Sequence, residues 1–365
     1  MASMPDLYEV IPLYITKEGR ILTSQHLRKL NNYHNLPLLE KMAEQVTLPA
    51  SPASNVLTSV EAPLFRKSHS RPFDVLFPCF HGGVGEGGWI QGLAEYYQIP
   101  LVGTGLTGAA LGMDKVAMKA IFSGVGIKQA PYLWFSRHDW KTRPSQILKH
   151  ILATFSYPIF VKPSRGGSSI GTTCVNTKTE LTHALDLAAG LDTRLLIEQG
   201  ITGAREINVS IMGNAGHPLE SSICEEVFHE GNTFLNFSNK YLSGGKSQGM
   251  ANTDRQIPAH LQPATAHKIQ VLGQQVFNLL DCAGLVRIDF LVKGTTIYCI
   301  EINTIPGSLS FYLWEKSGYS YPQLLDHLIQ LALARHTETQ ATLTDFVSPI
   351  LSNAQLGNKL SGKLG

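Results

Sequence analysis

The chain has 365 residues, of which 43% are hydrophobic and 16% are charged, and its formal net charge is +2. This length is sufficient for two or three domains with buried cores. The near-neutral charge gives no support for a nucleic-acid partner, and no apolar run approaches the length that spans a bilayer.

The cysteines indicate a reducing compartment. They are odd in number and well separated: Cys79, Cys174, Cys224, Cys282 and Cys299. Most occur in apolar, strand-like context, which favours buried free thiols. The first residues show no basic segment followed by an apolar one, as a secretory signal would. We therefore expect a cytoplasmic protein with no membrane partner.

The first part of the chain is predicted to be an α/β unit. Residues 7–16 have the apolar character of a strand, and so do residues 73–80, which the loop HGGVGEGG follows. Residues 90–99 have helical spacing. Residues 100–105 are typical of a short strand and turn.

The middle of the chain alternates between the two kinds of element. Helices are predicted at 113–127, near 142–155 and at 180–191, and strands at 130–135, 159–163 and 194–199.

The last part begins with a strand-rich region from residue 204. A helix is predicted at 263–282, a hairpin at 285–292 and 295–303, and a closing helix at 321–336. The residues that follow are polar, and their composition predicts partial disorder.

The hairpin carries polar residues on otherwise apolar strands. Side chains alternate between the faces of a strand, so Arg287 and Asp289 share one face. Glu301 and Asn303 share a face of the second strand. Two like charges on adjacent strands repel unless a cation lies between them, and carboxylate and amide oxygens suit Mg²⁺ or Mn²⁺. The alternative is a solvated polar face with one Arg–Asp pair, but the sequence favours a metal site.

The segment IFVKPSRGGSSIG, residues 159–171, is a predicted strand that leads into a glycine- and serine-rich loop. We name residues 164–171 the clamp loop. Its backbone N–H groups and hydroxyls could surround phosphate oxygens, while Lys162 supplies a point charge. The pattern matches neither GxxxxGK[ST] nor GxGxxG after a first strand. Lys115, at the start of a predicted helix, is by itself interpreted as an exposed surface residue.

Three more polar residues lie on or after predicted strands. A carboxylate that accepts two hydrogen bonds suits a ribose diol, and Glu198 and Glu206 both occur near strand ends. An exposed strand glutamate is an equally good interpretation of either. His81 directly follows the strand predicted at 73–80, where ligands of open α/β sheets gather. A histidine there could also serve only to cap the loop.

Taken in order, these motifs resemble the D-alanine–D-alanine ligase family of the ATP-grasp superfamily. They are HGxxGExGxxQG, MDK, VKPSxxGSSxG, LIEQGITGARE, KY, RxDF and ExNTxPG. The resemblance implies an ATP-grasp fold of α/β and α+β type with three domains. It divides the chain into an incomplete Rossmann-like N-terminal domain at 1–112, a central ATP-grasp domain at 113–200, a C-terminal ATP-grasp domain at 201–336 and a polar tail at 337–365.

The resemblance also implies an ATP site between two domains. In this family Lys115 and Lys162 would bind the phosphates, and the clamp loop with Ser169 would close over them. The other residues implied in nucleotide binding are Glu198, Gln199, Ile201, Glu206 and Lys240. Two Mg²⁺ (or Mn²⁺) ions would be held by Asp289, Glu301 and Asn303.

The implied activity is the ATP-dependent joining of two D-alanines through an acyl phosphate, for peptidoglycan precursors. By resemblance, Arg287 and the N–H of Gly307 would stabilise the tetrahedral oxygen, and His81 would place the first substrate. Ser168 and Tyr241 would connect the clamp loop to a second loop. Ser310 would bind the carboxylate of the second substrate. The family also implies a homodimer of the bacterial cytoplasm.

The chain departs from the family pattern in several places. The usual opening strand, GGxSxEHxVS-like loop and helix, about thirty residues, are not found, so we expect a truncated or an impaired enzyme. Gly87 stands in place of an aspartate and Gln199 in place of a frequent lysine. The segment PGSLSFYLW is short, so the acceptor could be another amino or hydroxy acid. A catalytically silent nucleotide-binding protein is a further alternative.

Overall fold

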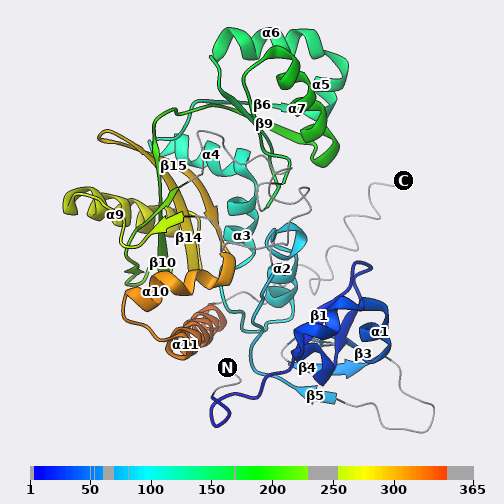
Figure 1. Ribbon diagram of the computed structural model, residues 1–365. Helices are drawn as coiled ribbons and strands as arrows, with labels where there is room; N and C mark the ends of the chain where they lie inside the picture. Colours follow the sequence, from blue (N-terminus) through cyan, green and yellow to red (C-terminus); the bar gives the residue numbers. More distant parts are fainter. Residues whose placement is uncertain are drawn as a thin grey trace, which may run out of the picture.

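The structure is a computed structural model that describes residues 4–49, 51–52, 54–60, 70–80, 82–167, 170–228 and 254–342. Within these ranges the strands form three sheets that follow one another along the chain. Figure 1 shows them as an N-terminal part, a central domain and a C-terminal domain, with helix α4 (Lys115–Gly124) between the last two.

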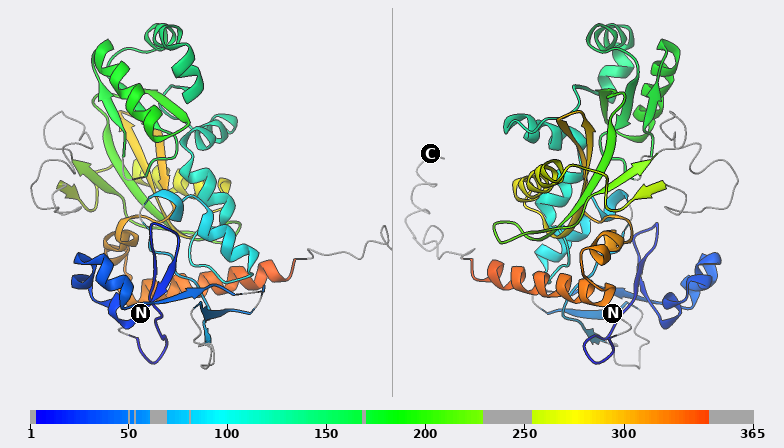
Figure 2. Two further views of the ribbon diagram at one scale, coloured as in Figure 1. Left: turned by 90° about the vertical axis from the view of Figure 1, so that its right-hand side faces the viewer. Right: turned by 60° about the vertical axis from the view of Figure 1, so that its left-hand side comes forward.

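The N-terminal part contains an antiparallel sheet with the strand order β1-β2-β3-β4-β5. Its strands are β1 (Leu13–Ile15), β2 (Ile21–Thr23), β3 (Glu44–Thr47), β4 (Val56–Ser59) and β5 (Ser70–Pro72). The short helices η1 (Gln25–Arg28), η2 (Leu30–His34) and α1 (Leu36–Lys41) connect β2 to β3. This sheet lies at the opposite end of the molecule from the helices of the central domain (Figures 1 and 2).

Prolines shorten the strands that were predicted here. The strand expected over 7–16 forms only after Pro12, whose backbone nitrogen has no hydrogen to donate. The prediction of a strand over 73–80 is wrong, because only Leu76 pairs within it, through an isolated parallel bridge to Leu101. Pro78 interrupts the same apolar run.

The α/β character predicted for this region survives in its second half. The helix predicted at 90–99 is confirmed as α2 (Trp89–Tyr96), and the one-turn helix η3 (Gly83–Gly85) precedes it. Because the bridged residues flank α2 and run parallel, they form a minimal β-α-β connection. Helix α3 (Leu106–Met113) then leads to α4.

The central domain is an antiparallel sheet covered by helices, and all its predicted elements are confirmed. The strand order is β6-β9-β7-β8. The strands are β6 (Tyr132–Ser136), β7 (Ile159–Pro163), β8 (Thr173–Val175) and β9 (Arg194–Gln199), and the helices are α5 (Arg137–Thr142), α6 (Pro144–Thr154) and α7 (Lys178–Leu191). Alternate residues of β7 are buried against α6 and α7, so Lys162 projects from the other face.

The C-terminal domain is built on a larger antiparallel sheet with the order β13-β12-β10-β14-β15, and β11 pairs with β10 beside that path. The strands are β10 (Arg205–Asn214), β11 (Glu220–Ser221), β12 (Glu225–Phe228), β13 (Asp254–Gln256), β14 (Ala283–Lys293) and β15 (Thr296–Asn303). Its helices are α9 (Pro263–Leu279), η5 (Gly307–Ser310), α10 (Phe311–Lys316) and α11 (Tyr321–Gln340).

Two hydrophobic clusters hold this sheet. One joins α9 to β10 and β14, and it includes Met118 and Phe122 of α4, so α4 packs as part of the C-terminal domain. The other joins the sheet to α10 and α11 through Trp314 and Leu328. The helix predicted at 321–336 continues to Gln340 and begins with a capping box at Ser320.

The remaining general predictions concern cysteines and membranes. Three of the five free cysteines, Cys224, Cys282 and Cys299, are buried, as predicted, whereas Cys79 is exposed. Among the helices that the structure describes, none combines the length and the apolar character of a membrane span.

Candidate active site

The polar hairpin forms as predicted. In the ladder between β14 and β15, Asp289 lies opposite Glu301 and Arg287 lies opposite Asn303. The register shifts between Asp289 and Phe290, which is typical of a β-bulge that re-aims a side chain. The four polar side chains therefore lie together on one face of the sheet.

Asp289 is the most buried member of this group. Its carboxylate accepts hydrogen bonds from Nε and Nη2 of Arg287 at 2.7 and 2.8 Å, and from Nδ2 of Asn303 at 3.0 Å. Burial raises the pKa of Asp289 to about 6, against the opposing effect of Arg287, and the negative charges of Glu301 and Glu206 raise it further. A carboxylate that is costly to ionise next to a second carboxylate is well placed to bind a cation.

The donor set of the hairpin fits magnesium or manganese. No three His, Cys, Asp or Glu side chains form a metal-binding cluster in the described part of the chain. The hairpin instead offers two carboxylates and one amide oxygen, which are hard oxygen ligands. Such ions keep several waters and bind through one or two carboxylates together with substrate phosphates. A pair of carboxylates is therefore enough for Asp289 and Glu301 to serve this purpose.

Lys115 links the hairpin to the clamp loop. It is the first residue of α4, and its side chain is 12% exposed. Its Nζ donates to the carbonyl of Gly166 at 3.0 Å and lies 3.4 Å from Oε2 of Glu301. The pKa of Glu301 is lowered because Lys115 and Lys162 outweigh the opposing effect of burial. The exposed-lysine alternative for Lys115 is therefore wrong.

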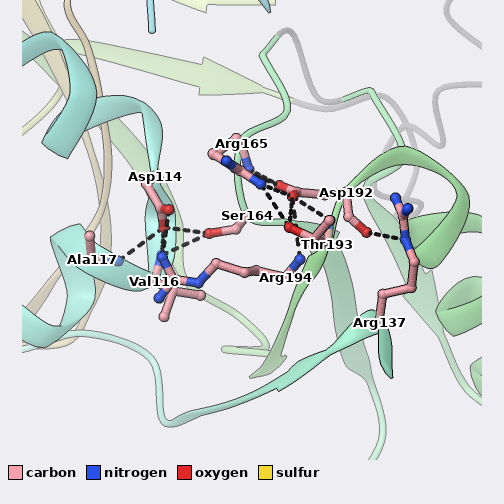
Figure 3. A network of polar contacts seen from close by, with 9 residues as sticks. All are labelled: Asp114, Val116, Ala117, Arg137, Ser164, Arg165, Asp192, Thr193 and Arg194. Atoms are coloured by element: carbon pink, nitrogen blue, oxygen red, sulfur yellow. Dashed lines mark hydrogen bonds and ion pairs between the residues drawn. The ribbon is translucent and has the colours of Figure 1, made fainter. Parts of the chain in front are cut away.

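A polar network around Asp114 holds the first turn of α4, and with it Lys115, in this position, and Figure 3 shows the side chains of that network. Asp114 caps α4 by accepting from the N–H groups of Val116 and Ala117, both at 3.1 Å. The same carboxylate accepts from Oγ of Ser164 at 2.6 Å and from Nη1 of Arg194 at 2.6 Å. The backbone N–H of Lys115 donates to the carbonyl of Ser164 at 3.0 Å. The start of α4 is thus bonded to the start of the clamp loop.

The second half of this network fixes the base of the clamp loop (Figure 3). Asp192 accepts from the backbone N–H of Arg165 at 2.7 Å and from its Nη2 at 2.6 Å. Nε of Arg137 donates to the carbonyl of Asp192 at 3.1 Å. The pKa of Asp192 is lowered because the bonds from Arg165 outweigh desolvation. None of these contacts could be read from the motif pattern.

Lys162 lies near the C-terminal end of β7 and pairs with a buried glutamate. Its Nζ is 2.6 Å from Oε2 of Glu198, and its side chain is 13% exposed. The other carboxylate oxygen, Oε1, is 2.6 Å from Nζ of Lys119. Desolvation would raise the pKa of Glu198, but the two lysines outweigh it and lower the pKa to about 2. We name these residues, Lys119, Glu198 and Lys162, the lysine–glutamate triad.

Sequence reasoning missed Lys119. The exposed-strand interpretation of Glu198 is wrong, because its side chain is only 4% exposed. A signal for Lys119 was available, since it lies four residues after Lys115 and therefore on the same side of the predicted helix.

The other predicted nucleotide contacts that the structure describes lie on β9, on β10 and in the connection between them. Gln199 ends β9, and its Nε2 donates to the carbonyl of Ser156 at 2.8 Å, so this side chain braces the neighbouring loop. Ile201 follows it in the connection to β10. Glu206 lies on β10 opposite Leu291, and its charge acts on Asp289 and on Lys162.

The turn after the hairpin has an unusual backbone. Three consecutive residues, Ser308, Leu309 and Ser310, have φ angles of 51°, 52° and 46°, in the left-handed region that non-glycine residues rarely adopt. Gly307 precedes them as the first residue of η5. The hydroxyl of Ser310 is buried and has no hydrogen-bond partner.

Five of the predicted site residues, His81, Ser168, Ser169, Lys240 and Tyr241, lie outside the described residues. Their described neighbours reveal another carboxylate that was missed. A Cβ built on Gly167 would lie 2.7 Å from Cα of Gly82 and 3.6 Å from Oε2 of Glu86, so the clamp loop approaches this segment closely. Burial raises the pKa of Glu86 to about 7, with Lys115 opposing and Glu301 adding to the shift.

Two antiparallel sheets that share α4, with a lysine of α4 bonded to both the clamp loop and a carboxylate hairpin, define an ATP-grasp protein. The narrower class comes from comparison with known families. A family model described as "D-ala D-ala ligase N-terminus" matches residues 1–104, and one described as "D-ala D-ala ligase C-terminus" matches residues 121–330. The chain therefore belongs to the D-alanine–D-alanine ligase family.

Individual relatives agree with this assignment. A D-alanine–D-alanine ligase of Ruminiclostridium cellulolyticum is 37% identical over 348 residues, which is 93% of this chain and 90% of the relative. One of Acetivibrio thermocellus is 43% identical over 276 residues, which is 74% of this chain and 70% of the relative.

Solved structures show the same fold. The D-alanine–D-alanine ligase from Coxiella burnetii is 28% identical with a TM-score of 0.72, covering 90% of this chain and 85% of that one. The VanG D-Ala:D-Ser ligase from Enterococcus faecalis is 26% identical with a TM-score of 0.72, covering 90% of each chain. The ATP-grasp fold and the family expected from the motifs are thus confirmed.

Proposed function

We propose that this protein joins two D-alanines into a dipeptide at the expense of ATP, through an acyl-phosphate intermediate. The observation that carries the proposal is the 3.4 Å contact between Lys115 and Glu301, since it brings a phosphate-binding cation beside the metal-binding hairpin. Family membership and relatives named D-alanine–D-alanine ligase at 37% and 43% identity support the choice of substrate.

The nucleotide would lie across both ATP-grasp domains. Lys115 and Lys162 are cations that can bind its phosphates, and their side chains are 12% and 13% exposed. The segment from Glu198 to Ile201 would hold the adenine through its backbone groups, with Gln199 bracing that segment, and Glu206 would bind the ribose. Ser169 and Lys240 complete the nucleotide contacts proposed from the family pattern.

Two Mg²⁺ or Mn²⁺ ions would be held by Asp289, Glu301 and Asn303. When bound, they would neutralise charge on the transferred phosphoryl group. Arg287 already donates to both oxygens of Asp289, so it would keep that carboxylate oriented while a remaining lone pair is offered to an ion.

The reaction needs no protein nucleophile. The carboxylate of the first D-alanine attacks the γ-phosphorus, and ADP leaves. The amine of the second D-alanine then attacks the acyl carbon, loses a proton, and phosphate leaves. Negative charge on the tetrahedral carbon's oxygen would be stabilised by Arg287 and by the N–H of Gly307.

Substrate placement is assigned to the remaining residues. His81 would place the first substrate, and Ser168 with Tyr241 would connect the clamp loop to the second loop, so that water cannot reach the acyl phosphate. The buried hydroxyl of Ser310, without a hydrogen-bond partner, would bind the carboxylate of the second substrate. We further propose a homodimer that supplies peptidoglycan precursors in the cytoplasm.

Coupled ADP release with D-alanine tests this function. We expect ADP and D-alanyl-D-alanine to form in equal amounts with Mg²⁺, and neither to form with L-alanine. A chain that binds ATP with Mg²⁺, seen as a raised melting temperature, yet makes no product from any substrate would be a silent homologue. That result would overturn the proposal.

A different acceptor is the second candidate function. The relative VanG is named a D-Ala:D-Ser ligase, and the turn at Ser308 to Ser310 carries two hydroxyls beside the hairpin. A panel of D-alanine, D-serine and D-lactate as acceptors separates the two functions. Turnover that is faster with D-serine or D-lactate than with D-alanine would favour the second.

A further inference from the structure

The mechanism above leaves one buried cation without a role. Lys119 lies on α4, one turn after Lys115, and its side chain is 1% exposed. Its ammonium group is 2.6 Å from Oε1 of Glu198, 3.5 Å from Oε1 of Gln129 and 5.2 Å from the ring centroid of Tyr132. Burying a lysine so completely is unfavourable unless its charge is paired with a charge of opposite sign.

The charges of the lysine–glutamate triad do not balance. The two carboxylate oxygens of Glu198 form ion pairs with Lys119 and Lys162, respectively, each at 2.6 Å. Counted within the triad, two ammonium groups and one carboxylate leave a surplus of one positive charge, and Glu206 and Glu301 act on Lys162 from outside it. The side chain of Lys162 is 13% exposed, against 1% for Lys119 and 4% for Glu198. The surplus charge can therefore meet a ligand only through Lys162.

We infer that Lys119 is a positioning residue that keeps the charge of Lys162 available for the phosphates of the nucleotide. Without Lys119, Glu198 and Lys162 would form a neutral pair, and the carboxylate would compete with phosphate for the lysine. With Lys119 present, Glu198 is held by two cations and orients Lys162 without neutralising it. This inference rests on the proposed function, because it takes the ligand of Lys162 to be a nucleotide phosphate.

The position of Lys119 on its helix supports this role. Its neighbours Met118 and Phe122 pack into the core of the C-terminal domain. Lys119 lies on an adjacent side of the helix and reaches Glu198 on β9 of the central domain. Helix α4 therefore places Lys115 against the hairpin and Lys119 against Glu198. The positions of Lys115 and Lys162, the two lysines proposed to bind phosphate, thus both depend on α4.

A purely structural role is the competing explanation. In that case Lys119 would only join the two domains, and its loss would weaken every contact of the nucleotide alike. The charge argument makes a narrower prediction. Loss of Lys119 should weaken ligands that carry phosphate and spare those that do not, because only phosphate needs the positive surplus.

The experiment measures dissociation constants of ADP with Mg²⁺, and of adenosine, by titration calorimetry on the full chain. The variants are Lys119→Met, Lys119→Arg and the double variant Lys119→Met with Glu198→Gln. Lys119→Met removes the surplus charge, Lys119→Arg keeps it, and the double variant restores it by removing one charge of each sign. Melting temperatures are recorded for all of them.

We expect Lys119→Met to weaken ADP by about tenfold and adenosine by less than about twofold. Lys119→Arg and the double variant should recover most of the lost ADP affinity. If the single variant does not fold, the double variant still tests the idea, because its ADP affinity should then be close to that of wild type.

Three results overturn the inference. The first is equal loss of ADP and adenosine in Lys119→Met, and the second is unchanged ADP affinity in that variant. The third is a double variant that binds ADP no better than Lys119→Met does. If only the double variant folds, the corresponding result is ADP binding about tenfold weaker than that of wild type. Failure of the proposed function is distinguishable. Wild-type protein that binds no nucleotide would refute both ideas, whereas wild-type protein that binds ADP but forms no dipeptide would refute the proposed function alone.

Discussion

Replacing Asp114 by alanine tests whether one carboxylate positions Lys115 and the clamp loop, the two elements proposed to bind phosphate. Asp114 caps α4, accepts from Ser164 at the start of the clamp loop, and pairs with Arg194 on β9. Asp114→Ala removes all three contacts at once. We expect the variant to be less stable and to bind the triphosphate more weakly.

The size of the effect follows from these contacts. Loss of an N-cap carboxylate costs about 1 kcal/mol. The hydrogen bond from Ser164 to a charged acceptor contributes about 1.5 kcal/mol more. The pair with Arg194 adds about 0.5 kcal/mol, because that side chain is 31% exposed and solvent screens the charges. A total of about 3 kcal/mol corresponds to a fall in melting temperature of roughly 6–12 °C for a folding unit of about 150–250 residues.

The assay combines thermal unfolding with steady-state kinetics. Asp114→Ala should raise the KM for ATP, because Lys115 and the clamp loop lose their common support, and should leave the KM for D-alanine nearly unchanged. Thr177→Ala is the matched control, since Thr177 caps α7 by accepting from the N–H of Glu180 and does not contact Lys115. The control should lower the melting temperature by a few degrees and leave the KM for ATP as it is.

The reasoning is refuted if Asp114→Ala melts no lower than the control and keeps the wild-type KM for ATP. A lower melting temperature with an unchanged KM would refute the positioning argument alone. In that case the network of Figure 3 would stabilise the domain without directing Lys115.

Three further predictions concern the remaining site residues. Desolvation would raise the pKa of Glu198, but its two lysine partners lower it from 4.5 to about 2. The stability that this carboxylate contributes is therefore complete above about pH 4.5 and is lost as the pH falls towards 2. The melting-temperature difference between wild type and Glu198→Gln should shrink over that window, and a constant difference would contradict this prediction. Glu301→Gln should weaken Mn²⁺ binding in the presence of a non-hydrolysable ATP analogue by at least about tenfold, measured by the spin resonance of free Mn²⁺, and equal affinity would exclude Glu301 as a ligand. Ser310→Ala should not lower the melting temperature, since its buried hydroxyl has no hydrogen-bond partner, but should raise the KM for the acceptor; an unchanged KM would remove Ser310 from the acceptor site.

The sequence predicted those parts of the fold that depend on alternation and helical spacing. The hairpin is the clearest case, because the two-residue period of a strand already placed Arg287 with Asp289 and Glu301 with Asn303. The exact pairing was not set by the turn length alone, since a register shift between Asp289 and Phe290 brings Asp289 opposite Glu301. The N-terminal part was harder to predict. An apolar run such as 73–80 suggests a buried strand, but strand pairing also needs free N–H groups and a partner, and the residues alone did not reveal that only Leu76 has one.

The candidate site shows a similar limit. Motif positions identified Lys162 and Lys115, because each stands at a fixed offset from a glycine-rich loop or a helix start. The groups that orient them come from elsewhere in the chain: Arg194 reaches Asp114, and Glu198 reaches Lys119, across 80 and 79 residues. Long-range contacts of this kind are set by packing of the sheet and helix, which local patterns do not encode.

The placement of α4 explains why these long-range contacts matter for the chemistry. Its apolar side chains, Met118 and Phe122, are fixed in the C-terminal core, and its first residue pairs with Glu301 of the hairpin in the same domain. Its polar contacts, however, run to the central domain, through Asp114 to the clamp loop and through Lys119 to β9. Any movement of the central domain against the hairpin must therefore strain contacts at the start and in the middle of one short helix. Phosphate groups that bind Lys115 and Lys162 together would add a further bond across the same joint, which is why nucleotide affinity and domain closure should change together in every α4 variant.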